Sequence, residues 1–81
     1  MKVEYSDAVN EALENAPAAV RKAFFKQVKF LAQNLHHPSL RAKKYDESQD
    51  RWQARVSKDW RFYFTITDDT YHILKLIPHP K

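Results

Sequence analysis

The chain has 81 residues, of which 43% are hydrophobic and 14% aromatic, and a net charge of +4 at neutral pH. It contains no cysteine and no glycine, which excludes disulfide bridges, thiolate metal sites and the glycine-rich loops that hold nucleotide phosphates. No apolar run approaches the roughly 18 residues that cross a bilayer, and the N-terminus lacks a signal-peptide pattern. We therefore expect one cytoplasmic domain over residues 1–81.

The positive charge is compatible with a polyanionic partner, although ordinary solubility charge explains the same balance. Its distribution is more informative, because acidic residues crowd the first fifteen positions while lysine and arginine run from Arg21 onward. This asymmetry favours a basic working face away from the first helix.

The first half of the chain predicts a short strand at 2–5 and two helices. Ser6 provides an N-cap for the first helix, and Asp7 lies where the helix dipole favours an anion. Pro17 suits the first turn of the second helix, which ends near His37 because Pro38 disfavours helical geometry there. One apolar stripe runs through about five turns of this second helix: Val20, Phe24, Val28, Leu31 and Leu35.

Three side-chain groups around the second helix have alternative interpretations. We expect Phe25 and Phe30 to widen the buried face, the alternative being a partner surface. The adjacent His36 and His37 suggest a metal site, but neighbouring side chains at a helix end diverge and no nearby Cys, Asp or Glu completes a ligand set. We therefore expect no metal and no cofactor. Residues 39–50 are polar and predict a solvated loop, which contains the densest cationic cluster of the chain.

The second half predicts three antiparallel strands. Apolar residues alternate with polar ones over 51–57 and again over 60–67, Asp68-Asp69 suits a tight turn, and a last strand runs from Thr70 to about Ile77. The fold class is therefore α+β, in the order β-α-α-β-β-β. We expect a small, twisted, mainly antiparallel sheet with a two-helix hairpin packed on one face.

Side chains of a strand alternate between the two faces of a sheet. We expect the inward face to hold Ala54, Val56, Phe62, Phe64, Leu74 and Leu76. The uncovered face then carries Arg55, Arg61, Tyr63, Lys75 and His79. Arginine offers planar donor pairs to phosphate, an aromatic ring can stack on an unpaired base, and histidine can move a proton near neutral pH. The pattern is compatible with RNA cleavage through the 2′-hydroxyl, the alternative being solvated arginines paired with Asp59, Asp68 or Glu47.

The sequence resembles the RelE/ParE toxin superfamily of bacterial type II toxin–antitoxin modules, in particular the RelE-like "cytotoxic translational repressor" branch. The resemblance rests on four segments: 37–44 (HPSLRAKK), 52–56 (WQARV), 59–64 (DWRFYF) and 74–79 (LKLIPH). It implies a cognate antitoxin partner and metal-independent cleavage of mRNA on the ribosome, without a membrane partner. It leaves the oligomeric state open.

The resemblance also implies roles for individual residues. Arg61 matches the arginine that stabilises the scissile phosphate, Arg55 matches a cation on the preceding strand, and His79 resembles a histidine that acts as acid or base. The residues expected to contact RNA are Arg41, Lys43, Lys44, Tyr63, Lys75 and Lys81.

The sequence departs from the pattern at its C-terminal end, where Ile77-Pro78 replaces the usual glycine before the histidine and no C-terminal tyrosine follows. Glu47 is the nearest candidate for a carboxylate base, and it lies in the polar loop. Two other functions therefore stay open for this fold: a ParE-like inhibitor of DNA gyrase, and a non-catalytic RNA- or protein-binding module.

Overall fold

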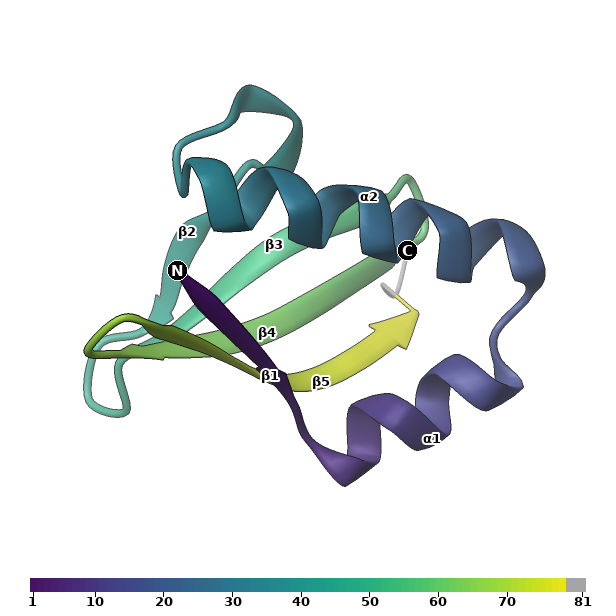
Figure 1. The fold of residues 1–81 in the computed structure, drawn as a ribbon, viewed down its shortest axis with the longest axis horizontal. Coiled ribbons are helices and arrows are strands. Elements are labelled where there is room, and N and C mark those ends of the chain that lie inside the picture. Colours follow the sequence, from purple (N-terminus) through teal and green to yellow (C-terminus); the bar gives the residue numbers. More distant parts are fainter. Residues whose placement is uncertain (79–81) are drawn as a thin grey trace.

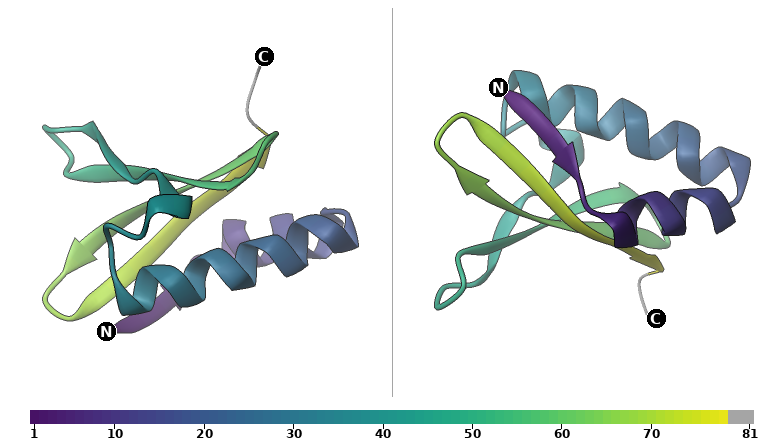
Figure 2. Two further views of the ribbon diagram at one scale, coloured as in Figure 1. Left: turned by 90° about the horizontal axis from the view of Figure 1, so that it is seen from above. Right: turned by 60° about the horizontal axis from the view of Figure 1, so that its bottom comes forward.

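The structure, a computed structural model, describes residues 1–78 and consists of one five-stranded sheet with both helices on one of its faces (Figures 1 and 2). The elements are β1 (Lys2–Tyr5), α1 (Asp7–Asn15), α2 (Ala18–Gln33), the short 3-10 helix η1 (Pro38–Leu40), β2 (Lys43–Asp46), β3 (Arg51–Ser57), β4 (Trp60–Thr67) and β5 (Thr70–Pro78). No helix in this part of the chain is long and apolar enough to cross a membrane.

The strand order is β1-β5-β4-β3-β2. Strands β2 to β5 pair antiparallel, and β1 runs parallel to β5, with Lys2 opposite Thr70. The predicted α+β class, the two helices between the first strand and the meander, and the mainly antiparallel sheet are confirmed.

The prediction of a loop over residues 39–50 is wrong in part, because this segment forms η1 and the edge strand β2. Lys43 lies opposite Gln53 and Lys44 opposite Trp52. The strand shows no apolar alternation because it lies at the edge of the sheet and its side chains are solvated. Lysine side chains on such an edge also prevent pairing with other chains. Its pairing depends on β3, so local sequence does not reveal it.

Helix α1 begins after Ser6 as predicted, and α2 begins at Ala18, so Pro17 is its N-cap and does not lie within its first turn. The Ser6 hydroxyl accepts a hydrogen bond from the Val9 N–H at 3.1 Å and donates one to the Leu74 carbonyl of β5 at 2.8 Å. The cap of α1 thus also fixes this helix to the sheet. Helix α2 ends at Gln33, a turn earlier than the proline rule predicted, because Asn34 turns to extended backbone with φ −161°.

The core lies between α2 and the inner face of the sheet, where Phe24, Phe62 and Phe64 are fully buried. The rings of Phe24 and Phe62 meet edge to face, with centroids 5.6 Å apart. Phe25 does not widen this core, since half of its surface is exposed, whereas Phe30 is partly buried against it. The prediction assumed that the two helices cover each other, whereas α1 packs on β5 and α2 packs on β3 (Figure 2).

The prediction that Leu74 of the last strand faces the helices is wrong. Tyr63 pairs with Lys75 but Phe64 pairs with Ile73, so Leu74 is an extra residue that forms a β-bulge. The bulge reverses the alternation before it, and therefore Tyr71 and Ile73 are buried while Leu74 turns away from the helices. The other inward residues are buried as predicted: Ala54, Val56, Phe62, Phe64 and Leu76.

Candidate functional site

Two arginines face each other on the uncovered sheet face, close to the turn that joins β3 and β4. Arg55 of β3 and Arg61 of β4 are direct cross-strand partners, an arrangement in which like charges destabilise a sheet. Neither takes part in an ion pair with a described residue. The alternative of pairing with Asp59, Asp68 or Glu47 therefore has no support in the described chain.

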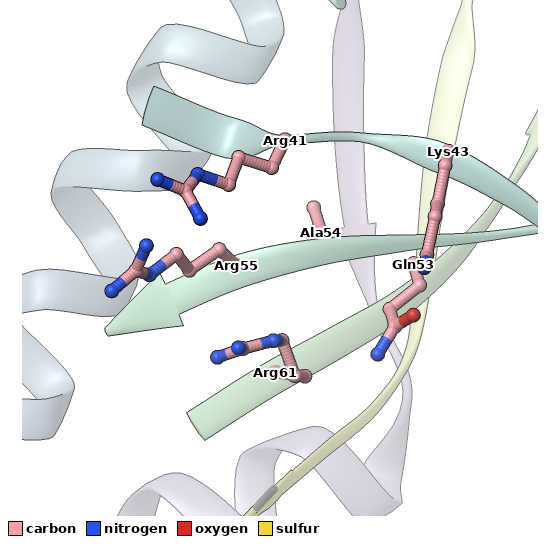
Figure 3. A pocket seen from close by; sticks show the side chains of 6 residues that line it. All are labelled: Arg41, Lys43, Gln53, Ala54, Arg55 and Arg61. Carbon is pink, nitrogen blue, oxygen red and sulfur yellow. The ribbon is translucent and has the colours of Figure 1, made fainter. Parts of the chain in front are cut away.

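The arginines line a hollow of about 270 Å³ together with residues from the η1–β2 connection and from β2. We call it the cationic hollow; its lining residues are Arg41, Lys43, Gln53, Ala54, Arg55 and Arg61. Figure 3 shows the three guanidinium groups directed to the same side, whereas Lys43 and its cross-strand partner Gln53 lie farther along β2 and β3, away from these groups. The hollow thus gathers four cations and one amide, without a carboxylate or an imidazole among its lining residues.

Arg61 is held in place by the turn that precedes it. Its Nη1 donates to the carbonyls of Ser57 at 2.7 Å and Trp60 at 2.9 Å. In the described chain, no acceptor is bonded to its Nε or Nη2, which leaves these donors for a ligand. A guanidinium fixed on one side in this way loses less conformational freedom when it binds an anion.

Gln27 positions Arg55 from the helix side, and sequence reasoning missed it. Its side chain is buried, and its Nε2 donates to the carbonyls of Arg55 at 2.8 Å and Ser39 at 3.0 Å. The Ser39 hydroxyl in turn donates to Gln27 Oε1 at 3.2 Å. Gln27 lies within the apolar stripe of α2, three positions after Phe24 and four before Leu31. A polar residue at such a position is the sequence signal that could have identified its role.

A second hollow, of about 430 Å³, continues the first around the edge of β3. Arg41 and Arg55 line both, and Lys26 of α2 adds a further cation. The cations therefore form a track that leads from the sheet face toward α2.

The remaining predicted residues lie in three places. Tyr63 and Lys75 line a separate hollow on the same sheet face. Lys44 is already engaged, since its Nζ lies 2.6 Å from Asp50 Oδ1 and 5.5 Å from the centre of the Trp52 ring. The hydrogen bond with Asp50 raises the pKa of Lys44. His79 and Lys81 lie outside the described residues.

His36 and His37 do not combine with other ligands. Within residues 1–78 no three His, Cys, Asp or Glu side chains gather in a way that could hold a metal ion. His37 stacks on Phe30 with ring centres 4.0 Å apart, and its Nδ1 accepts the Ser39 N–H at 3.2 Å. These contacts give His37 a structural role at the start of η1.

The sequence matches no protein-family profile and no curated protein sequence. Solved structures do resemble the chain. A RelE–RelB complex from Pyrococcus horikoshii contains a chain with a TM-score of 0.83 and 24% identity, covering 99% of this chain and 96% of that one. A YoeB/ParE toxin from Agrobacterium tumefaciens has a TM-score of 0.83 and 10% identity, covering 99% and 100%. The isolated Escherichia coli RelE toxin has a TM-score of 0.78 and 10% identity, covering 99% and 85%. The chain therefore has the RelE/ParE fold.

Proposed function

We propose that this chain is the toxin of a type II toxin–antitoxin module and that it inhibits translation by cleaving mRNA on the ribosome. The observation that carries the proposal is the cationic hollow, where two directly opposed arginines have no counter-charge in the described chain. Such a cluster costs stability unless an anion fills it. Its occurrence on the uncovered face of a RelE/ParE fold supports RNA as that anion.

The arrangement fits phosphoryl transfer within the RNA strand. The 2′-oxygen forms a bond to phosphorus as the bond to the leaving 5′-oxygen breaks, so a 2′,3′-cyclic phosphate and a free 5′-hydroxyl result. Negative charge grows on the phosphoryl oxygens during this step, and fixed guanidinium donors stabilise it. Arg61 is the main such donor because of its anchoring turn, and Arg55 and Lys43 complete the cationic environment.

Proton transfer requires a group that the cationic hollow lacks among its described residues. His79 is our candidate, as a base for the 2′-hydroxyl or as an acid for the leaving 5′-oxygen. It follows Pro78, which lies opposite Trp60, the neighbour of Arg61 on β4. This role depends on the resemblance to RelE-like toxins.

The cognate partner is an antitoxin protein. The archaeal RelE structure is a complex with RelB, and a YoeB from Staphylococcus aureus is solved in complex with YefM. By analogy we propose a small protein that covers the cationic face of this chain and blocks access of RNA.

Expression of the chain with the Arg61→Ala substitution tests the proposal. We expect the wild-type chain to arrest growth and to create new 5′ ends within transcripts. Arg61→Ala should lower cleavage about 100-fold or more, the usual loss when one donor to a developing oxyanion is removed. Lys2→Ala, an exposed change on β1, is the matched control and should arrest growth like wild type.

Mapping of transcript 5′ ends after induction separates this proposal from the two other functions of the fold. Growth arrest with intact transcripts and a DNA-damage response supports a ParE-like gyrase inhibitor instead. Ribosome binding without new 5′ ends supports a non-catalytic RNA-binding module, which the lack of an acid or base among the described lining residues also favours. If Arg61→Ala cleaves transcripts like wild type, the assigned site is wrong.

A further inference from the structure

We propose that Tyr45 and Tyr63 form a stacking subsite for one nucleobase of single-stranded RNA, beside the cationic hollow. The inference rests on the proposed function, because it assigns the base next to the phosphate that the arginines bind. The subsite is the hollow that Tyr63 and Lys75 line on the uncovered sheet face, which has a volume of about 220 Å³ and which we call the tyrosine hollow. Its lining residues are Tyr45, Arg51, Tyr63, Leu74, Lys75 and Ile77.

The two rings leave an aromatic surface open to solvent. Their centroids lie 5.1 Å apart at an interplanar angle of 60°, so the rings meet edge to face rather than covering each other. Tyr45 is 60% exposed, although it is one of the largest side chains of the domain. A flat, unpaired base gains stacking contacts with such rings, while every base offers a suitable face.

Two irregularities of the sheet direct side chains into this hollow. Lys44 pairs with Trp52 and Asp46 with Arg51, so Tyr45 is the extra residue of a bulge in β2. Leu74 is the extra residue of the bulge in β5. Bulges interrupt a hydrogen-bonded ladder and redirect side chains, and they are common beside functional sites. Two bulges on two different strands that turn toward one hollow indicate that its shape is a specific feature of the fold.

The tyrosine hollow lies at the correct distance from the arginines for a single nucleotide. Gln53 and Tyr63 are cross-strand partners, two positions along from the Arg55–Arg61 pair. Two residues along a strand correspond to about 7 Å, a length that a ribose spans between its phosphate and its base. Gln53 lines the cationic hollow and its Nε2 lies 3.5 Å from the Tyr63 hydroxyl, so the two hollows are adjacent.

Charge favours RNA over an apolar segment of a protein as the occupant. Arg51 and Lys75 line the tyrosine hollow, which has no carboxylate among its lining residues. A nucleotide supplies both a base for the rings and phosphates for these cations. An apolar peptide side chain offers no counter-charge to either cation.

Binding of a strand that cannot be cleaved tests the subsite without relying on activity. The probe is a fluorescent hexaribonucleotide with 2′-O-methyl riboses, compared with the same strand carrying abasic positions, and both affinities are measured by anisotropy at low salt. Tyr45→Ala should weaken the base-containing strand about 5- to 100-fold, the range for loss of one stacked base. It should change the affinity for the abasic strand less than 2-fold. Tyr45→Phe, which keeps the ring, should restore most of the affinity.

The matched control is Phe25→Ala, which removes a half-exposed aromatic ring from α2 and should leave both affinities unchanged. Equal losses for the base-containing and abasic strands in Tyr45→Ala overturn the subsite, and so does no loss for either strand. If Tyr45→Ala weakens only the complex with the antitoxin, the surface is a protein interface and the proposal is wrong. A failure of the proposed function is distinct, since it is read from transcripts that stay intact after induction, whereas binding of the uncleavable strands does not depend on cleavage.

Discussion

Arg41 has an unusual backbone conformation for its residue type. Its φ of 47° and ψ of 42° are left-handed, a region that costs a residue with a β-carbon roughly 1–2 kcal/mol. Asp50 and Asp68 also have positive φ, but their short polar side chains tolerate it better. Arg41 lines both the cationic hollow and the neighbouring hollow of about 430 Å³, so the backbone strain lies at the proposed RNA-binding site.

Replacement of Arg41 separates its backbone cost from its charge. Arg41→Gly relieves the left-handed strain and one like-charge repulsion, so the free energy of unfolding should rise or stay equal. Arg41→Ala removes the same charge but keeps the strain, and should be about 1 kcal/mol less stable than Arg41→Gly. Both variants should bind RNA equally weakly. Urea denaturation checks the first expectation, and equal stability of the two variants contradicts the assigned strain.

At the scale of elements, the geometry of the cationic hollow depends on how α2, η1 and β3 are joined. Strand β2 ends its pairing with β3 at Gln53, so the β3 edge beyond this residue has no neighbouring strand. Gln27 takes the place of a neighbouring strand there, because its side chain donates a hydrogen bond to the Arg55 carbonyl of that edge. It also forms hydrogen bonds with the carbonyl and the hydroxyl of Ser39 in η1. One helical side chain thus sets the positions of the segments that carry Arg41 and Arg55.

Loss of this junction should be visible in stability and in structure. Gln27→Leu keeps the volume but leaves the Arg55 and Ser39 carbonyls without their donor, so the free energy of unfolding should fall by about 1–3 kcal/mol. Gln33→Leu, an exposed change on the same helix, is the matched control. Amide chemical shifts around Arg55 should change only in Gln27→Leu. If both variants are equally stable, the junction does not fix β3.

The sequence predicts this fold as far as regular alternation extends. Ala54, Phe62 and Phe64 were assigned inward from period two alone, and Arg55 and Arg61 to the opposite face. The assignment of Leu74 was wrong because a bulge depends on the register with β4, which a single strand does not reveal. Tyr45 was missed for the same reason, since its strand becomes apparent only through its pairing with β3.

At the scale of the whole molecule, charge is distributed unequally over the domain. The acidic residues of the first fifteen positions lie on β1 and α1, namely Glu4, Asp7, Glu11 and Glu14. Most cations of the cationic hollow and the tyrosine hollow come from β3, β4 and the segment that runs from Arg41 into β2: Arg41, Lys43, Arg51, Arg55 and Arg61. Lys75 of β5 is the exception, because it also lines a hollow with Glu11 of α1. The predicted basic face away from the first helix agrees with this arrangement. An anionic strand is therefore attracted to one face and oriented before contact.

Salt dependence of RNA binding measures how many of these cations act together. For single strands, the logarithm of the binding constant falls with the logarithm of salt concentration by about 0.7 per neutralised phosphate. The four cations of the cationic hollow then predict a slope of about −3 for the uncleavable hexaribonucleotide. Arg61→Ala should make the slope less steep by about 0.7, whereas Lys2→Ala on the far edge should leave it unchanged. The measurement is anisotropy between 50 and 200 mM salt, the range in which such contacts dominate. An unchanged slope in Arg61→Ala would show that the strand crosses the sheet elsewhere.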